Sequence, residues 1–265
     1  MTQAAKETVR IAAIGDLHHS RTAAPGGLQS LFAQMNEAAD ALVLCGDLTD
    51  YGLAEEARSL VREMAALKIP AVTVLGNHDL QSGQESEIVK ILTDAGIPAL
   101  DGDTTEIHGI GFAGIKGFAG GFGRRALGPW GEDIIKKFVH EAVNEALKLE
   151  TALARLRTER LIAILHYSPI QATVEGEPRE IFPFLGCSRL EEPLTRYPVT
   201  AVFHGHAHHG RPEGRTSTGA PVFNVSMSMM RELFPDRPFR VVEVRMPPTA
   251  VEARPDGSTS ETVLR

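Results

Sequence analysis

Residues 9–18 read VRIAAIGDLH, a largely apolar run that ends in a glycine, an aspartate and a histidine. The same arrangement recurs in residues 41–50, which read ALVLCGDLTD, and in residues 71–79, which read AVTVLGNHD. These runs do not alternate polar with apolar side chains, which is typical of strands covered on both faces in a layered α/β sheet. The three stretches therefore predict buried strands, each followed directly by metal-binding side chains.

The pattern continues in the second half of the chain. Leu161–Leu165 and Val199–Phe203 are predicted as further buried strands, followed by the segments LHYSP and GHAH. Helical spacing and helix-stop residues predict helices over Leu53–Lys68, Glu85–Ala95 and Glu132–Arg157, the last as one long helix or two abutting ones. A more irregular group of strands is predicted to form a second sheet with hairpin connections, at Thr105–His108, Gly111–Lys116, Val222–Val225 and Arg240–Arg245.

The predicted fold belongs to the α/β class. Two packed mixed sheets flanked by helices would bury this much apolar sequence, in a four-layer α-β-β-α sandwich with a metal site at the C-terminal ends of the strands. With 265 residues and no internal repeat, residues 1–265 are predicted to form a single domain. Residues 117–131 and 168–186 match no element, and residues 247–265 are predicted to be a loose C-terminal tail.

Composition excludes several classes of protein. The net charge of −7 argues against a broad nucleic-acid surface, which usually shows as a basic patch. The two cysteines, Cys45 and Cys187, make no disulfide framework, so a reducing cytoplasm is the simpler prediction. Met1–Arg10 lacks the apolar core of a signal peptide, and no apolar stretch approaches the roughly 20 residues that cross a bilayer. We therefore expect a cytoplasmic protein without a membrane partner.

The polar residues behind the strands are aspartate, asparagine and histidine, which suit divalent metal ions. A glycine precedes the first of them in four of the five motifs, and glycine permits a sharp turn at the end of a strand. Ligand sites in α/β sheets lie outside the carboxyl ends of the strands, so we expect the motifs to converge on one rim. Seven side chains are too many for one tetrahedral ion and about right for two: Asp16, His18, Asp47, Asn77, His166, His206 and His208.

The ordered series D-x-H, GD-x-x-D, GNHD, H and GH-x-H resembles the calcineurin-like metallophosphoesterase superfamily, and within it the class III cyclic-nucleotide phosphodiesterase type. The motifs span Asp16 to His208, and five of them in order are a far stronger signal than one GD-x-x-D alone. The resemblance implies that Asp47 bridges two metal ions. It assigns the other ligands to the first ion, through Asp16, His18 and His208, and to the second ion, through Asn77, His166 and His206.

The resemblance also implies phosphoester hydrolysis at two divalent ions, with nitrogen and oxygen ligands that fit manganese, iron, zinc or cobalt. His78 would face the leaving group and protonate the departing oxygen. Asp79 would orient His78 through a hydrogen bond, and Asp50 could act in the same way on a ligand. The predicted substrate is a small soluble phosphoester, for which a cyclic nucleotide is one candidate. The sequence does not predict the oligomeric state.

Other functions stay open at this point. LHYSP departs from the HHPP-like form common in cyclic-nucleotide enzymes, which leaves monoesters and other diesters as substrates. A nuclease is the main alternative, although the acidic charge balance disfavours it. A lipid-diphosphate hydrolase would need an apolar surface that the sequence does not indicate. A metal-binding scaffold without catalysis is the alternative from another class, disfavoured because every ligand and His78 are present.

Several residues outside the motifs have two interpretations. Arg124 and Arg125 could reach a substrate phosphate from their glycine-rich loop, or they could be a solvated pair. His204 lies in an apolar run and is predicted to be a core histidine with its hydrogen bonds satisfied. Cys45 is predicted to be a buried core thiol, and His19 either touches substrate or is a solvated histidine at the rim.

Overall fold

The first sheet contains the strands whose sequence opens the chain. A computed structural model describes residues 6–248. In it, a four-stranded sheet has the order β10-β1-β2-β3. The pairs β1–β2 and β2–β3 are parallel and β1–β10 is antiparallel. The strand bounds are β1 (Thr8–Ile14), β2 (Ala41–Cys45), β3 (Ala71–Val74) and β10 (Arg240–Arg245).

The second sheet has six strands in the order β4-β5-β6-β7-β9-β8. Its four inner strands run parallel, and β4 and β8 are antiparallel edges. The bounds are β4 (Asp103–Ile107), β5 (Ile110–Gly114), β6 (Arg160–Ile164), β7 (Val199–His204), β8 (Glu213–Arg215) and β9 (Pro221–Asn224).

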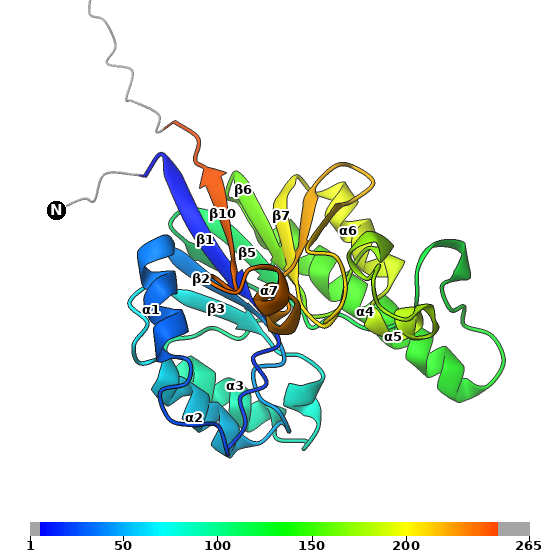
Figure 1. The fold of residues 1–265 in the computed structure, drawn as a ribbon. Coiled ribbons are helices and arrows are strands. Elements are labelled where there is room, and N and C mark those ends of the chain that lie inside the picture. The colour runs from blue at the N-terminus through cyan, green and yellow to red at the C-terminus, as the bar shows by residue number, and fades with distance from the viewer. Residues whose placement is uncertain (1–5, 249–265) are drawn as a thin grey trace, which may run out of the picture.

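Helices cover the outer face of each sheet. In Figure 1, α1, α2 and α3 lie on one side of the strands, and α4 and α6 lie on the other. The helix bounds are α1 (Gln29–Ala38), α2 (Ala54–Met64), α3 (Glu85–Asp94), α4 (Asp133–Arg155), α5 (Phe182–Leu185), α6 (Glu191–Arg196) and α7 (Met227–Leu233). Short 3-10 turns are η1 (His78–Leu80), η2 (Gly123–Arg125), η3 (Gln171–Thr173), η4 (Arg179–Ile181) and η5 (Ser188–Leu190). Across residues 6–248, none of the helices has both the length and the apolar composition needed to cross a membrane.

Three layers of buried apolar side chains separate the four layers of secondary structure. Ile14 of β1 packs with Phe32 of α1 and Leu60 of α2 in the first layer. Ile11, on the opposite face of β1, packs with Ile162 of β6 between the two sheets. The third layer joins the second sheet to α4 and α6. Since successive side chains of a strand point to opposite faces, burial on both faces explains why the strand sequences are continuously apolar. The predicted four-layer sandwich of two mixed sheets is thereby confirmed.

The predicted division of strands between the sheets is wrong in three places. β6 and β7 belong to the second sheet, and β10 pairs with β1 in the first sheet. The inner strands of the second sheet are parallel, so hairpins are confined to β4–β5 and β8–β9. An apolar run records burial on both faces and contains no information about which sheet supplies its neighbours. Residues 249–265 of the predicted tail lie outside the described residues.

Candidate metal centre

The predicted ligands all follow the carboxyl ends of parallel strands, and the structure brings them together where the two sheets meet. The Gly15 amide donates to the Val225 carbonyl at 2.8 Å, and the Gly205 amide donates to the His166 carbonyl at 3.1 Å. The first bond joins the end of β1 to the segment after β9. The convergence expected from the strand-end pattern is therefore present in the fold.

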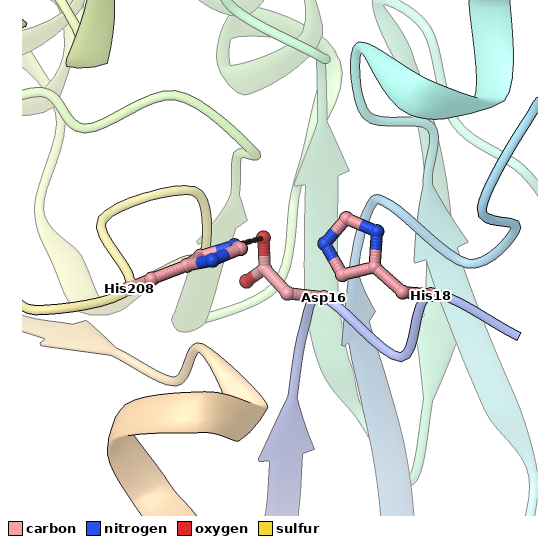
Figure 2. A group of neighbouring side chains, drawn as sticks. All are labelled: Asp16, His18 and His208. Atoms are coloured by element: carbon pink, nitrogen blue, oxygen red, sulfur yellow. Dashed lines mark hydrogen bonds and ion pairs between the residues drawn. The ribbon is translucent and has the colours of Figure 1, made fainter.

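One group of candidate ligands consists of Asp16, His18 and His208. Figure 2 shows the Asp16 carboxylate at the end of β1, between the imidazole rings of the two histidines. His208 Nε2 donates to Asp16 Oδ1 at 3.1 Å, and the His206 amide donates to the same carboxylate. Asp16 is 3% exposed, so this is a buried carboxylate surrounded by nitrogen atoms.

A second group lies beside it and contains Asp47, Asn77, His166 and His206. The side chains of Asp47, His166 and His206 are close enough to share an ion, and His166 is fully buried. Asn77 Oδ1 lies 2.9 Å from His166 Nε2, which places the neutral amide oxygen at the same nitrogen as the carboxylate. All four predicted ligands of the second ion are therefore adjacent.

Asp47 lies between the two groups. Its Oδ2 atom is 3.8 Å from His18 Nε2 and 3.4 Å from His166 Nε2. Its other oxygen, Oδ1, accepts a hydrogen bond from the His78 amide at 2.8 Å. The carboxylate is thus held by one oxygen, while the second oxygen faces a histidine from each group.

Two histidines are oriented by backbone carbonyls that no side-chain motif reveals. His166 Nδ1 donates to the Cys45 carbonyl at 2.8 Å, which leaves Nε2 facing Asp47 and Asn77. His206 Nε2 donates to the Phe184 carbonyl at 3.1 Å, which leaves Nδ1 as its remaining lone-pair donor. Histidines that bind metals commonly donate their other ring N–H to a carbonyl, which fixes the tautomer.

The charges of the cluster fit a bound cation. Burial disfavours the ionised form of Asp47, but the neighbouring His166 nevertheless holds the pKa of that carboxyl well below its usual range. Burial likewise opposes protonation of His166, and Asp47 nevertheless raises the pKa of its imidazole to about 9. The buried carboxylates thus require positive charge at this nitrogen, which a divalent ion would supply while displacing the proton.

His18 gives a second indication that the site suits metal ions. Its Nε2 atom is buried and has no hydrogen-bond partner among residues 6–248. Burial lowers the pKa of this imidazole, which favours the neutral form that binds metals. An unpartnered buried nitrogen is costly in a folded protein, and coordination of an ion would satisfy it.

The backbone is strained at four of the candidate ligands. The φ angle is 57° at Asp16, 43° at His18, 47° at Asp47 and 68° at His206. This left-handed region disfavours residues with a Cβ and costs on the order of 1 kcal/mol for each residue. The four strained positions all belong to the predicted site, and backbone strain is common in functional centres.

The glycines of the motifs act differently from the prediction. Only Gly46 of the four has a positive φ, of 78°. A Cβ on Gly76 would collide with the Asp47 carboxylate, and a Cβ on Gly205 would collide with the Asp16 carboxylate. These two glycines therefore provide clearance for ligands from another strand, while the left-handed turns are made largely by the ligands themselves.

His78 lies at the rim of the centre, in η1. Its Nδ1 atom donates to the Asp50 carbonyl at 2.7 Å, and its ring packs edge-on against His18 at a centroid distance of 4.5 Å. The Asp50 carboxylate lies 3.6 Å from His18 Nδ1, just beyond hydrogen-bond distance, so its support of a ligand stays a prediction. His18, Asp50 and His78 thus form a third acidic and imidazole group that opens on the same site.

The predicted hydrogen bond between His78 and Asp79 is wrong. Asp79 is fully buried and accepts hydrogen bonds from the amides of Leu48, Thr49 and Gly76, at 3.2, 2.8 and 2.8 Å, and from the Thr49 hydroxyl at 2.6 Å. Burial raises the pKa of Asp79, while the bonds from Gly76 and Thr49 oppose that change. The carboxylate joins the loop of Asp47 to the loop of Asn77, and the His78 ring is held by the Asp50 carbonyl instead.

Two histidines outside the motifs, His204 and His19, have structural partners. His204 is fully buried, with Nδ1 bonded to the Gly205 carbonyl and Nε2 to the Thr173 hydroxyl, both at 2.8 Å, so the predicted core histidine is confirmed. His19 is buried, and its Nε2 atom lies 3.0 Å from the Ser59 hydroxyl, so it is not a solvated histidine at the rim. Cys45 is buried with a free thiol, as predicted.

Comparisons with known proteins connect the chain to one family. The family described as Calcineurin-like phosphoesterase matches residues 9–210. No curated protein sequence matches the chain.

Solved structures give a likeness of fold at low sequence identity. The protein TT1561 of Thermus thermophilus is 14% identical, with a TM-score of 0.53 over 89% of this chain and 98% of that chain. Another crystal structure is 16% identical, with a TM-score of 0.57 over 83% of this chain and 91% of its own. The chain therefore shares its fold over nearly the whole length of both proteins.

Proposed function

Because the matched profile spans residues 9–210, the chain belongs to the calcineurin-like phosphoesterase family, and we propose that it hydrolyses a small soluble phosphoester with two divalent metal ions. The observation that carries the binuclear proposal is the position of Asp47 Oδ2, between His18 Nε2 at 3.8 Å and His166 Nε2 at 3.4 Å. A single carboxylate oxygen facing both groups suits a shared ligand. We also propose that the protein acts in the cytoplasm, where its two free cysteines, Cys45 and Cys187, would stay reduced.

The proposed ligands divide as the geometry groups them. Asp16, His18 and His208 would hold one ion, and Asn77, His166 and His206 would hold the other, with Asp47 shared. When bound, two such ions acidify a water molecule at neutral pH and neutralise the charge of the phosphoryl group. Any of manganese, iron, zinc and cobalt fits these nitrogen and oxygen donors.

His78 is proposed to act on the leaving group. Its Nδ1–H is occupied by the Asp50 carbonyl, so Nε2 is the nitrogen available to hold a proton for the departing oxygen. The His78 amide is fixed on Asp47 Oδ1, so the imidazole that handles the proton and the proposed shared ligand are positioned together. This connection makes proton delivery dependent on the same loop that supplies the ligands.

The proposed function is tested with chromogenic esters. We expect protein loaded with manganese to release p-nitrophenolate from bis-p-nitrophenyl phosphate or p-nitrophenyl phosphate, to lose this activity on chelation, and to regain it with added metal. Metal analysis of the active protein should give two ions per chain. If fully loaded protein hydrolyses neither ester nor any other phosphoester, the non-catalytic scaffold is the better description.

Replacing His78 with glutamine should affect substrates according to their leaving groups. For diphenyl phosphate, whose phenolate is strongly basic, we expect kcat to fall about 10²-fold, because general acid catalysis contributes most to poor leaving groups. For bis-p-nitrophenyl phosphate the fall should be several times smaller. The exposed His140 on α4, replaced in the same way, is the matched control. Equal losses on both diesters, with the metal content unchanged, would contradict the proposed role.

A further inference from the structure

A concave surface lies between the two loops that match no predicted element. This cavity has a volume of about 880 Å³. One wall is residues 121–125, which include η2, and the other is formed by parts of residues 171–183, which include η3 and η4. Four arginines line it: Arg124, Arg125, Arg179 and Arg211.

The cavity carries a surplus of positive charge on a chain whose net charge is −7. Its two acidic lining residues are already engaged, since Glu175 pairs with Arg211 at 3.2 Å and Glu177 accepts the His209 amide at 2.7 Å. The guanidinium groups of Arg124, Arg125 and Arg179 have no hydrogen-bond or ion-pair partner within residues 6–248. Exposed arginines are often merely solvated, but here they converge on one hollow from separate segments.

Backbone hydrogen bonds hold the two walls against each other. The Gly121 amide donates to the Gly186 carbonyl at 2.8 Å, and the Ser188 amide donates back to the Gly121 carbonyl at 3.2 Å. The Gly120 amide donates to the Pro183 carbonyl at 2.7 Å. Arg124 and Arg125 are therefore presented from a turn that is fixed on the neighbouring wall.

The cavity is joined to the metal centre by short covalent and hydrogen-bonded links. Pro183 lines the cavity, and the carbonyl of the next residue, Phe184, accepts the hydrogen bond from His206 Nε2. Glu177 binds the amide of His209, which directly follows the proposed ligand His208. The segments that hold the His206 ring and the His209 amide therefore also line the cavity.

We propose that the cavity binds a second anionic group of the substrate, a phosphate or a carboxylate, while the reacting phosphoester lies at the metal centre. The proposal rests on the proposed function and refines its substrate class to phosphoesters that bear a further negative group. Guanidinium groups recognise phosphate and carboxylate oxygens with paired, charge-assisted hydrogen bonds, and three unpaired guanidinium groups are available. The positive charge of the cavity also opposes the repulsion that a chain with a net charge of −7 exerts on an anionic substrate.

The test compares two substrates that differ by one phosphate. Metal-loaded protein is assayed with thymidine 5′-(p-nitrophenyl phosphate), with and without a 3′-phosphate. We expect the 3′-phosphorylated ester to have the lower KM, by roughly tenfold, because a hydrogen-bonded charge pair contributes about this factor. Arg124→Gln and Arg179→Gln should each remove much of that advantage and leave KM for the unphosphorylated ester unchanged. Arg231→Gln, an exposed arginine of α7, is the matched control.

A titration calorimetry experiment separates this proposal from the proposed function. Thymidine 3′,5′-bisphosphate should bind the metal-loaded protein more tightly than thymidine 5′-phosphate does, and Arg179→Gln should abolish the difference, whether or not either ester is hydrolysed. Loss of hydrolysis with this binding pattern intact would count against the proposed function alone. Equal affinities for the two nucleotides, or equal effects of the arginine substitutions on both, would overturn the anion-binding cavity.

Discussion

Replacing Asp47 with asparagine should abolish phosphoester hydrolysis, with a fall in kcat of ~10³-fold or more. Asparagine keeps an oxygen that can accept the His78 amide, so the local backbone should survive the change. It removes the negative charge that faces His18 and His166 from one oxygen atom. A neutral amide cannot balance two divalent ions as a shared carboxylate does, so both the occupancy of the ions and their spacing should be affected.

The measurement combines steady-state kinetics with metal analysis. We expect Asp47→Asn protein to retain its secondary structure by circular dichroism and to contain fewer than two ions per chain after dialysis against dilute metal. Asp94→Asn on the exposed end of α3 is the matched control, since its carboxylate is exposed and pairs with Lys90. Activity within about tenfold of the parent protein would contradict the assignment of Asp47 as the shared ligand, because removing one group that stabilises transition-state charge already costs about 10² or more.

Sequence patterns predict that the candidate ligands converge, and the fold brings them together, because the predictive signal is local. A buried strand followed directly by aspartate, asparagine or histidine can be recognised within about ten residues of sequence. Parallel strands then bring such strand ends to one edge of the sheet. The assignment of β6 and β7 to sheets could not be predicted in this way, because pairing partners come from distant segments. Helix α1 lies outside the predicted helices, although Leu31, Phe32 and Met35 are buried and have the spacing of a short amphipathic helix.

The support behind the candidate ligands was the least predictable part of the site. The Cys45 and Phe184 carbonyls orient two histidines, and backbone carbonyls have no residue signature. The left-handed conformation was expected at glycines, but Asp16, His18, Asp47 and His206 adopt it. Tertiary packing imposes such strain, so it can be read only from the folded chain. Arg179 and Arg211 were likewise overlooked, because only the fold brings them beside Arg124 and Arg125.

Asp79 shows how a correct motif can carry an incorrect role. The GNHD sequence makes His78 and Asp79 neighbours, and the predicted role of Asp79 is to orient His78 through a hydrogen bond. The structure instead places the Asp79 carboxylate beneath the Asp47 loop, where it accepts hydrogen bonds from the amides of Leu48, Thr49 and Gly76. We therefore propose that Asp79 is a positioning residue, which sets the distance between the segments that carry Asp47 and Asn77.

Replacing Asp79 with alanine should consequently lower both the stability of the protein and its affinity for metal. Three buried amides would lose their acceptor, and each such loss costs about 1–3 kcal/mol, so we expect the free energy of unfolding to fall by at least about 3 kcal/mol in urea titrations. Thr49→Val, which removes only the hydroxyl that donates to Asp79, is the matched control and should cost about 1 kcal/mol.

A second measurement distinguishes positioning from a purely structural role. The folded fraction of Asp79→Asn protein, which retains one acceptor oxygen, should bind manganese roughly 10–100-fold more weakly than the parent, as is usual when a partner behind metal ligands is changed. Titrations at a temperature well below the unfolding midpoint measure this affinity independently of stability. Unchanged manganese affinity in folded Asp79→Asn protein, together with a lowered free energy of unfolding, would mean that the carboxylate stabilises the two loops without setting the geometry of the centre.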